Sequence, residues 1–165
     1  ENKSKLAQKD IDANWTKKNG ERHFGYKDHV KCDADSKLIT NYSVTSASVH
    51  DSQRCLVFIG QEDKVLYADS AYSGKPIALA LPENCKNQIC EKGYRNSPLT
   101  SEQKMNNRRK SRIRCRIEHI FGFMTGAMHG ITIRSIGITR AWMNIGITNL
   151  VYNFCRYSYL KRTSA

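Results

Sequence analysis

The sequence lacks the cysteine spacing of a metal-binding module. Its six cysteines include no Cys-x-x-Cys pair and no tight cluster with histidine, which argues against a zinc finger. Disulfides are not expected in a reducing compartment, so we interpret most of these cysteines as small buried hydrophobes with free thiols. Stability must then come from an ordinary hydrophobic core, which a chain of 165 residues is long enough to form.

Long apolar runs are also missing. No stretch approaches the ~18 residues that span a bilayer, and the polar opening of the chain is unlike a secretory signal. We therefore expect no membrane partner and a cytoplasmic or nucleoid location. The first residue is Glu1 rather than Met, which indicates a fragment of a longer protein. No nucleophile elbow, phosphate-binding glycine loop or dinucleotide fingerprint is present in the sequence.

Acidic residues are in short supply. The chain has 15 Asp and Glu against 27 Lys and Arg, which leaves a net charge of +12. An excess of this size indicates an anionic partner, most often nucleic acid, although a merely basic soluble protein has the same composition. A solvated helix face is the ordinary explanation of a basic run. The run ahead of Glu118 has few acidic neighbours, so we expect it to contact DNA phosphates through Arg108, Arg109, Lys110, Arg112, Arg114 and Arg116.

The first part of the chain predicts an antiparallel pair of strands. Residues 24–30 alternate in the manner of a strand, and residues 38–49 are rich in β-branched side chains. Residues 33–37 between them are typical of a turn. Residues 1–20 are polar and without periodicity, so we expect a loop or arm there.

The middle of the chain predicts short elements around a buried strand. Residues 64–68 form a short apolar run suited to such a strand, and Asp69 follows directly at its carboxyl end. We expect short helices at 53–59 and 75–81, and a further strand at 86–90. Chemistry in open α/β sheets occurs at the carboxyl ends of strands, which singles out Asp69.

The last part predicts helices. Thr100 and Gln103 have the spacing of a capping box, which begins a helix expected to run from 101 to about 128. Its apolar positions follow a 3.6-residue period: Ile113, Ile117, Ile120, Phe121, Met124 and Met128. A final helix follows Gly137, with an apolar stripe of Met143, Ile147, Leu150, Phe154 and Tyr157.

These elements predict a mixed α/β (α+β) fold, with a mixed sheet and helices packed on it. We expect residues 1–165 to be a single domain. It would consist of the polar arm at 1–20, a sheet with short helices at 21–99, and a helical part at 100–165.

Two carboxylates are candidates for metal ligands. Glu118 lies at the edge of the apolar stripe on its helix, and Arg114 lies one turn earlier, where it can orient or neutralise the carboxylate. Cleavage of phosphodiesters by two metal ions needs hard oxygen ligands, and Mg²⁺ keeps several waters, so two or three carboxylates suffice. Asp69 and Glu118 are far apart in sequence, and the spacing alone favours a solvated or salt-bridged side chain over a metal ligand for each of them.

Five segments together resemble a known family, the bacterial insertion-sequence transposases of the DDE type, in the branch named after insertion sequence five. The segments cover nearly the whole chain in the order of the family, at 8–18, 23–27, 47–52, 68–72 and 114–122. The resemblance implies an RNase H-like fold and an Asp–Asp–Glu triad that holds two Mg²⁺ or Mn²⁺ ions. Asp69 matches the second acidic ligand, Glu118 the third, and Arg114 the arginine four residues before that glutamate.

The resemblance also implies what the protein does and what is missing. The activity would be metal-dependent cleavage and strand transfer of DNA, at the ends of the element and at its target, by a homo-oligomer. The first catalytic aspartate of the family lies on a strand upstream of this chain, and Asp10 and Asp12 are poor substitutes. We therefore expect a truncated domain that lacks its first strand and is inactive alone. The alternatives are a catalytically inactive DNA-binding remnant, or a nuclease or RNA-binding protein of the same fold.

Overall fold

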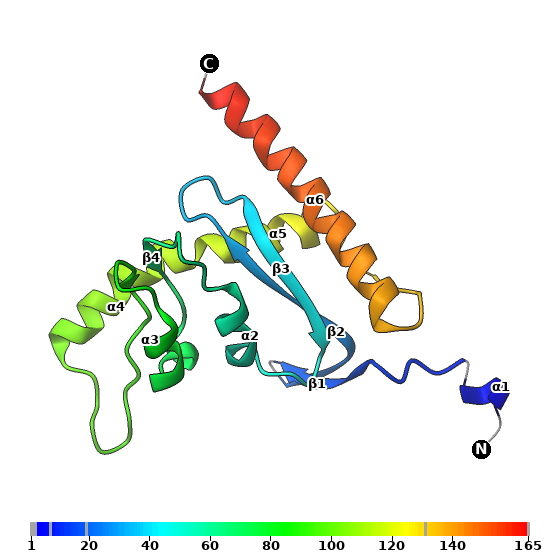
Figure 1. The fold of residues 1–165 in the computed structure, drawn as a ribbon, viewed down its shortest axis with the longest axis horizontal. Helices are drawn as coiled ribbons and strands as arrows, with labels where there is room; N and C mark the ends of the chain where they lie inside the picture. Colours follow the sequence, from blue (N-terminus) through cyan, green and yellow to red (C-terminus); the bar gives the residue numbers. More distant parts are fainter. Residues whose placement is uncertain (1–2, 7, 19, 131, 165) are drawn as a thin grey trace. The chain divides into compact units, whose positions relative to one another are not determined.

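The computed structural model describes residues 3–6, 8–18, 20–130 and 132–164, and it has the mixture of helices and strands that the sequence predicts. Two sheets are present in this part of the chain, one antiparallel with the order β1-β2-β3 and one parallel with β4 beside β5. Figure 1 shows the elements in chain order: α1 (Lys3–Leu6), β1 (Asn14–Lys18), β2 (Glu21–Cys32), β3 (Ile39–Ser46), α2 (Ser52–Phe58), β4 (Val65–Leu66), the 3₁₀ helix η1 (Ser70–Tyr72), α3 (Lys75–Ala80), β5 (Lys86–Asn87), α4 (Ser101–Arg114), α5 (Arg116–Gly126) and α6 (Ile138–Thr163).

The chain divides into two compact units. The first contains residues 1–51 and 121–165, and the second contains residues 52–120. No helix of the described ranges is both long and apolar enough to cross a membrane.

The antiparallel sheet of the first unit contains the predicted hairpin. β2 and β3 pair with Val30 opposite Tyr42, and the turn between them begins at Asp33. The Asp33 carboxylate accepts hydrogen bonds from the backbone N–H of Ser36 at 2.6 Å and from the Ser36 hydroxyl. Lys37 then adopts a φ of 60°, which closes the turn into β3. The expected strands and turn are thus confirmed.

The expected polar arm was wrong in part. Residues 14–18 form β1, which pairs antiparallel with the start of β2 and places Trp15 opposite Phe24. Their rings pack at 5.2 Å, and this cross-strand aromatic pair explains why a short polar segment becomes a strand. Residues 1, 2, 7 and 19 of the expected arm lie outside the described residues.

The helix α6 lies along β3 in the first unit (Figure 1). Polar side chains hold it there. The Asn153 amide donates to the carbonyl of Ile39 and accepts from its N–H, both at 2.8 Å. The Tyr152 hydroxyl donates to the Lys37 carbonyl at 3.0 Å, and Arg156 Nε donates to the Ser36 carbonyl at 2.7 Å. The polar face of α6 therefore satisfies the backbone at the beginning of an edge strand.

The predicted apolar stripe of α6 faces solvent instead of the sheet. The buried residues are Ala141, Ile145, Asn149 and Tyr152. These positions lie about two residues from those of the stripe, and two residues turn a helix by about 200°, which is the opposite face. The interpretation of the stripe as the packing face was wrong, because the side chains that bond the sheet backbone are polar and carry no hydrophobic signal.

The hydrogen bonds of Asn153 should contribute measurably to the free energy of unfolding. Asn153→Ala should lower the free energy of unfolding by about 1–3 kcal/mol, because it leaves the N–H and C=O of Ile39 half-buried without partners. Urea unfolding followed by circular dichroism measures this change. Asn144→Ala is the matched control, since Asn144 is exposed on the same helix and its side-chain amide donates to the Ser135 hydroxyl rather than to the sheet. Equal losses in the two variants would contradict the role of Asn153.

The second unit has a small core between its short helices and its parallel strands. Cys55 of α2, Ile77 of α3 and Ile89 form the buried cluster, against which Leu66 and Tyr72 pack. The strand expected at 64–68 is assigned only at Val65–Leu66, but the parallel bonding continues, with Cys90 N–H donating to the Ala68 carbonyl at 3.0 Å. Val65 is exposed, so the expectation of a fully buried strand was wrong.

The long helix expected from 101 to about 128 is two helices. α4 ends at Arg114, and α5 begins at Arg116. At the break, the N–H of Glu118 donates to the carbonyl of Cys115, three residues back rather than four. The helix tightens here without a proline or glycine, and the apolar spacing continues across the break, so the hydropathy pattern predicts one uninterrupted helix. The predicted capping box at the start of α4 is confirmed, with Thr100 and Gln103 bonding each other's backbone.

Candidate functional site

Asp69 begins the segment that follows the parallel strands. The last parallel bond reaches Ala68, so Asp69 is the first residue past the paired part of the strand. It caps η1: its Oδ1 accepts hydrogen bonds from the N–H and hydroxyl of Ser70. The side chain is exposed, and among the described residues nothing bonds Oδ2. The cap fixes the carboxylate while one oxygen stays open to solvent.

Glu118 lies in the first turn of α5. Its Oε1 pairs with Arg114 Nη2 at 2.8 Å, and its side chain is 59% exposed. The pairing across the α4–α5 break confirms the expectation that Arg114 orients Glu118. The positive end of the helix dipole also favours a carboxylate in a first turn. Glu118 therefore has the same arrangement as Asp69, with one oxygen bonded to its own segment and one oxygen open.

Both carboxylates belong to the second unit. Within the described ranges, no hydrogen bond or ion pair joins Asp69 to Glu118. No group of three or more His, Cys, Asp or Glu side chains is placed to hold a metal ion in that part of the chain either. Carboxylates with an open oxygen are the ligands that Mg²⁺ takes, so each residue fits the role by its chemistry. Their joint role as metal ligands stays a prediction.

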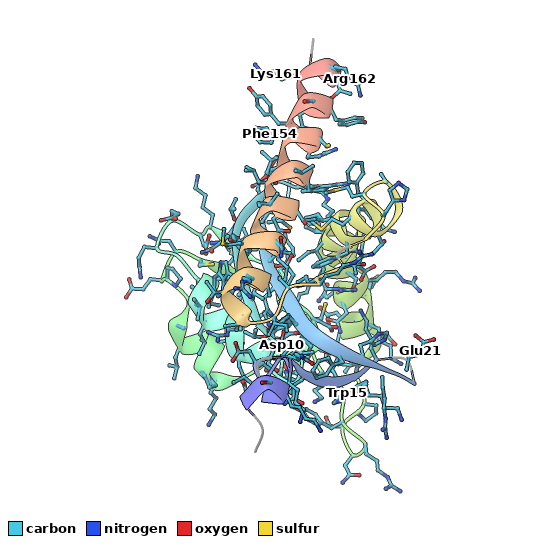
Figure 2. All side chains as sticks on the ribbon, turned by 90° about the vertical axis from the view of Figure 1, so that its right-hand side faces the viewer. Asp10, Trp15, Glu21, Phe154, Lys161 and Arg162 are labelled. Atoms are coloured by element: carbon cyan, nitrogen blue, oxygen red, sulfur yellow. The ribbon has the colours of Figure 1, made fainter. Side chains whose placement is uncertain are left out.

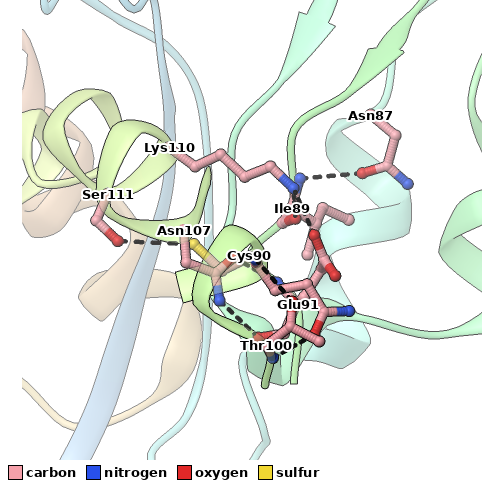
Figure 3. A network of polar contacts seen from close by, with 9 residues as sticks. Asn87, Ile89, Cys90, Glu91, Thr100, Asn107, Lys110 and Ser111 are labelled. Atoms are coloured by element: carbon pink, nitrogen blue, oxygen red, sulfur yellow. Dashed lines mark hydrogen bonds and ion pairs between the residues drawn. The ribbon is translucent and has the colours of Figure 1, made fainter. Parts of the chain in front are cut away.

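A network of polar contacts fixes α4 against the segment after β5 (Figure 3). The Asn107 amide bonds the N–H and C=O of Glu91, both at 2.9 Å. Lys110 Nζ donates to the Ile89 carbonyl at 3.0 Å and lies 3.7 Å from Glu91 Oε1. The Lys110 side chain is only 16% exposed, so its charge interacts with groups of the second unit rather than with solvent. Its predicted contact with DNA stays untested, but the structure gives it a role in docking α4.

Three arginines of α4 have no part in this network. Arg108, Arg109 and Arg112 are exposed, and their spacing of three and four residues places them on one side of the helix. Arg109 also lines a cavity of about 370 Å³ together with Tyr67, Gln88, Asn106, Lys110 and Ile113. This surface offers guanidinium groups beside neutral amides, a combination that suits phosphate oxygens. Arg114 forms an ion pair with Glu118, and Arg116 is half-buried.

Sequence reasoning missed the amide side chains that organise this region. Asn106, Asn107 and Gln88 either line the cavity or dock α4, and none was a candidate. The sequence signal that could have identified two of them is the Asn106–Asn107 pair. Asparagine does not favour helix formation, so a pair of asparagines inside an otherwise basic helix suggests a specific contact.

Asp10 and Asp12 have structural roles in the first unit. Gly137 N–H donates to Asp10 Oδ2 at 3.2 Å, and Ile138 N–H donates to Asp12 Oδ2 at 3.0 Å, so the two carboxylates bond the N-terminus of α6. Slight burial raises the pKa of Asp10, but the hydrogen bonds from the Tyr26 hydroxyl and from backbone N–H groups outweigh it and leave the pKa below 3.8. The two carboxylates thus help to hold the first turn of α6, and the expectation that neither substitutes for a catalytic aspartate stays a prediction.

The comparisons with known proteins define the class. The family model described as "Transposase DDE domain" matches residues 3–154, which is most of the chain. The chain therefore belongs to the DDE transposases of bacterial insertion sequences.

One curated relative shows the similarity in detail. It is the transposase for insertion sequence element IS1106 of Neisseria meningitidis serogroup B, 34% identical over 117 residues. The alignment covers 69% of this chain but only 40% of the relative, so the chain spans less than half of that protein's length. No solved structure matches the chain.

Proposed function

We propose that this chain is part of the catalytic region of a DNA transposase that cuts and joins DNA strands during transposition of an insertion sequence. The observation that carries the proposal is the pair of exposed carboxylates, each held by its own segment with one oxygen open, in a chain of the DDE family. The fold proposed is RNase H-like, and residues 1–165 contribute to one catalytic domain. An inactive DNA-binding remnant is the less favoured alternative.

In this proposal Asp69 and Glu118 are catalytic and hold Mg²⁺ or Mn²⁺. When bound, the metal would activate water or a DNA 3′-hydroxyl and stabilise charge on the phosphate. The residues of the chain position the ligands: Ser70 orients Asp69, and Arg114 orients Glu118. A third acidic residue is expected outside this pair, and the chain alone is proposed to cut little or no DNA.

The proposed DNA-binding residues are Arg108, Arg109, Lys110, Arg112, Arg114 and Arg116. The exposed arginines Arg108, Arg109 and Arg112 would make most of the phosphate contacts, because Lys110 and Arg114 already have acidic partners. The DNA would be the ends of the element and its target on the bacterial chromosome, bound by a homo-oligomer.

A double substitution tests this surface. Arg108→Ala with Arg112→Ala should weaken binding to duplex DNA about 10- to 100-fold at 0.1 M salt. It should also reduce the slope of log affinity against log salt by about 2, because two phosphate contacts are lost. Fluorescence anisotropy with a labelled duplex across a salt series measures both quantities.

The matched control removes the same charge elsewhere. Lys17 and Arg22 are exposed partners on β1 and β2, and Lys17→Ala with Arg22→Ala lowers the net charge equally. If both pairs reduced the salt slope to the same extent, binding would depend on total charge, and the assignment of the α4 surface would fail.

A further inference from the structure

The outer face of α6 is a continuous apolar surface. Met143, Ile147, Leu150, Phe154 and Tyr157 follow one another at intervals of four, three, four and three residues. They are 63%, 58%, 53%, 62% and 52% exposed, respectively. Figure 2 shows Phe154 on the helix, with Lys161 and Arg162 near its C-terminal end. We call these five residues the α6 stripe.

The interval of the α6 stripe is that of a coiled-coil seam. An average spacing of 3.5 residues keeps side chains aligned with a second helix, whereas the 3.6-residue period is that of a helix on a globular core. The core-facing residues of α6 lie on the other side, at Ala141, Ile145, Asn149 and Tyr152. A helix with one face packed on a sheet and a heptad seam on the opposite face has the geometry to accept another helix.

The α6 stripe is large for an exposed apolar surface. With exposures of about half or more on five large side chains, it presents on the order of 500 Å², and Val151, 42% exposed, borders it on one side. This area is at the upper end of the largest apolar patch of an ordinary monomer. It is smaller than the ~800 Å² that each partner contributes to a standard interface, which places a contact between two such stripes among the small, reversible ones.

Charge and spacing favour a second copy of the chain as the partner. The positions beside the stripe are uncharged, being Asn144, Val151 and Ser158 on one flank and Gly146, Asn153 and Leu160 on the other. Two identical helices therefore meet no like charges at these flanking positions. Lys161 Nζ lies over the Tyr157 ring, 5.7 Å from its centroid, so the C-terminal end of the stripe is positively charged. In an antiparallel pair centred on Leu150 the two Lys161 side chains lie at opposite ends of the contact. Leu150 is the middle residue of the stripe, and Met143 and Tyr157 lie equally far from it, so a two-fold axis near Leu150 places the whole stripe of each copy in the contact.

We propose that the α6 stripe is the contact surface between two copies of this chain, with Leu150 close to the two-fold axis. The association is hydrophobic and occurs between chains of net charge +12, so added salt strengthens it by screening their repulsion. DNA binding weakens with salt, and the dimer forms without DNA. The inference therefore stands or fails independently of the proposed activity.

Sedimentation velocity of the 165-residue chain at 1–100 μM and 0.3 M NaCl tests the proposal. We expect a concentration-dependent dimer, and we expect Leu150→Glu to weaken association more than about 100-fold, because a charge would be buried at the centre of the contact. Circular dichroism should show unchanged helix content, since Leu150 is exposed in the single chain.

Leu79→Glu is the matched control, because Leu79 is 85% exposed on α3, which belongs to the second unit. It should leave the dimer intact. Phe154→Ser serves as a second, uncharged variant on the stripe and should also shift the chain toward monomer. A wild-type chain that stays monomeric at 100 μM, or a dimer that survives Leu150→Glu and Phe154→Ser, would overturn the proposal.

Discussion

Asp69→Asn is expected to reduce strand cleavage at least about 1,000-fold in a transposase that contains this chain as its catalytic segment, while duplex binding changes little. The asparagine keeps an oxygen at the position of Oδ1, so it can still accept the hydrogen bonds of Ser70 and cap η1. The substitution therefore removes the negative charge without removing the local structure. Nicking of a labelled duplex in Mg²⁺, beside anisotropy for binding, separates the two effects.

Glu118→Gln should have an effect of similar size for the same reason. The amide oxygen of glutamine can still accept from Arg114, so the α4–α5 junction keeps its contact. Glu102→Gln is the charge-matched control, because Glu102 is exposed in the first turn of α4, far along the helix from Arg114. Cleavage that persists in Asp69→Asn, or that falls equally in Glu102→Gln, would refute the ligand assignment.

A second readout does not depend on cleavage. Mn²⁺ binding to the 165-residue chain, followed by electron paramagnetic resonance, should weaken in both Asp69→Asn and Glu118→Gln if the two carboxylates share an ion. Two variants that each leave Mn²⁺ binding unchanged would indicate separate roles for the two residues.

Local sequence rules predicted the elements whose cause is local. Asp33 bonds the turn that it begins, Thr100 and Gln103 cap the helix that they precede, and Arg114 pairs with Glu118 one turn later. Each of these contacts joins residues within four positions of one another, so their spacing in the sequence is enough to predict that they meet. The two site carboxylates themselves came from the family resemblance, since spacing alone could not distinguish them from solvated side chains.

The predictions that failed depended on contacts between distant residues. The packing face of α6 is set by Asn149, Asn153 and Arg156, which bond β2, β3 and the turn between them. A rule that assigns apolar residues to the core selects the opposite face of such a helix. A further contact that the sequence did not indicate is the bond of Lys110 to the Ile89 carbonyl, which depends on a segment twenty-one residues earlier.

The polar packing of α6 on the sheet also buries a contact between Asp28 of β2 and Asn149 of α6. Asn149 Nδ2 donates to Asp28 Oδ1 at 3.3 Å, while Asp28 Oδ2 and Asn149 Oδ1 are both buried without a hydrogen-bond partner. One proton on Oδ2 gives both orphaned oxygens a partner, in the paired arrangement of a carboxylic acid and an amide. Burial raises the pKa of Asp28 to about 6, against the lowering effect of the Asn149 bond, which favours that proton.

Other charged groups lie near this pair. Asp10 and Arg134 line the same cavity of about 440 Å³ as Asp28, together with Tyr26. Asp10 is an acid of lowered pKa, so it stays ionised across the range in which Asp28 titrates. Any change of stability between mildly acidic and alkaline pH that depends on position 28 therefore comes from the Asp28 carboxyl.

Asp28→Asn should therefore stabilise the chain at alkaline pH. The folded-state pKa of about 6 lies above the ordinary 3.8, so the folded chain binds the proton more tightly than the unfolded chain. Stability from this group is complete below about pH 4 and is lost as pH rises through 6, by up to about 3 kcal/mol for a shift of this size. An amide at position 28 donates to Asn149 Oδ1 at every pH, so the variant should escape the loss.

Urea unfolding of both proteins from pH 4.5 to pH 8 measures the difference, and comparing the two cancels the titration of groups common to both. We expect nearly equal stabilities at the acidic end and an advantage of about 1–3 kcal/mol for Asp28→Asn at pH 8. Asp35→Asn is the control, since Asp35 is exposed in the turn after β2 and the substitution removes the same charge. A pH-dependent advantage of the same size in Asp35→Asn would mean that the effect comes from the lost charge and not from position 28. A constant offset between wild type and Asp28→Asn at all pH values would mean that the carboxyl does not titrate in the folded chain, because only a proton gained or lost there makes their difference depend on pH.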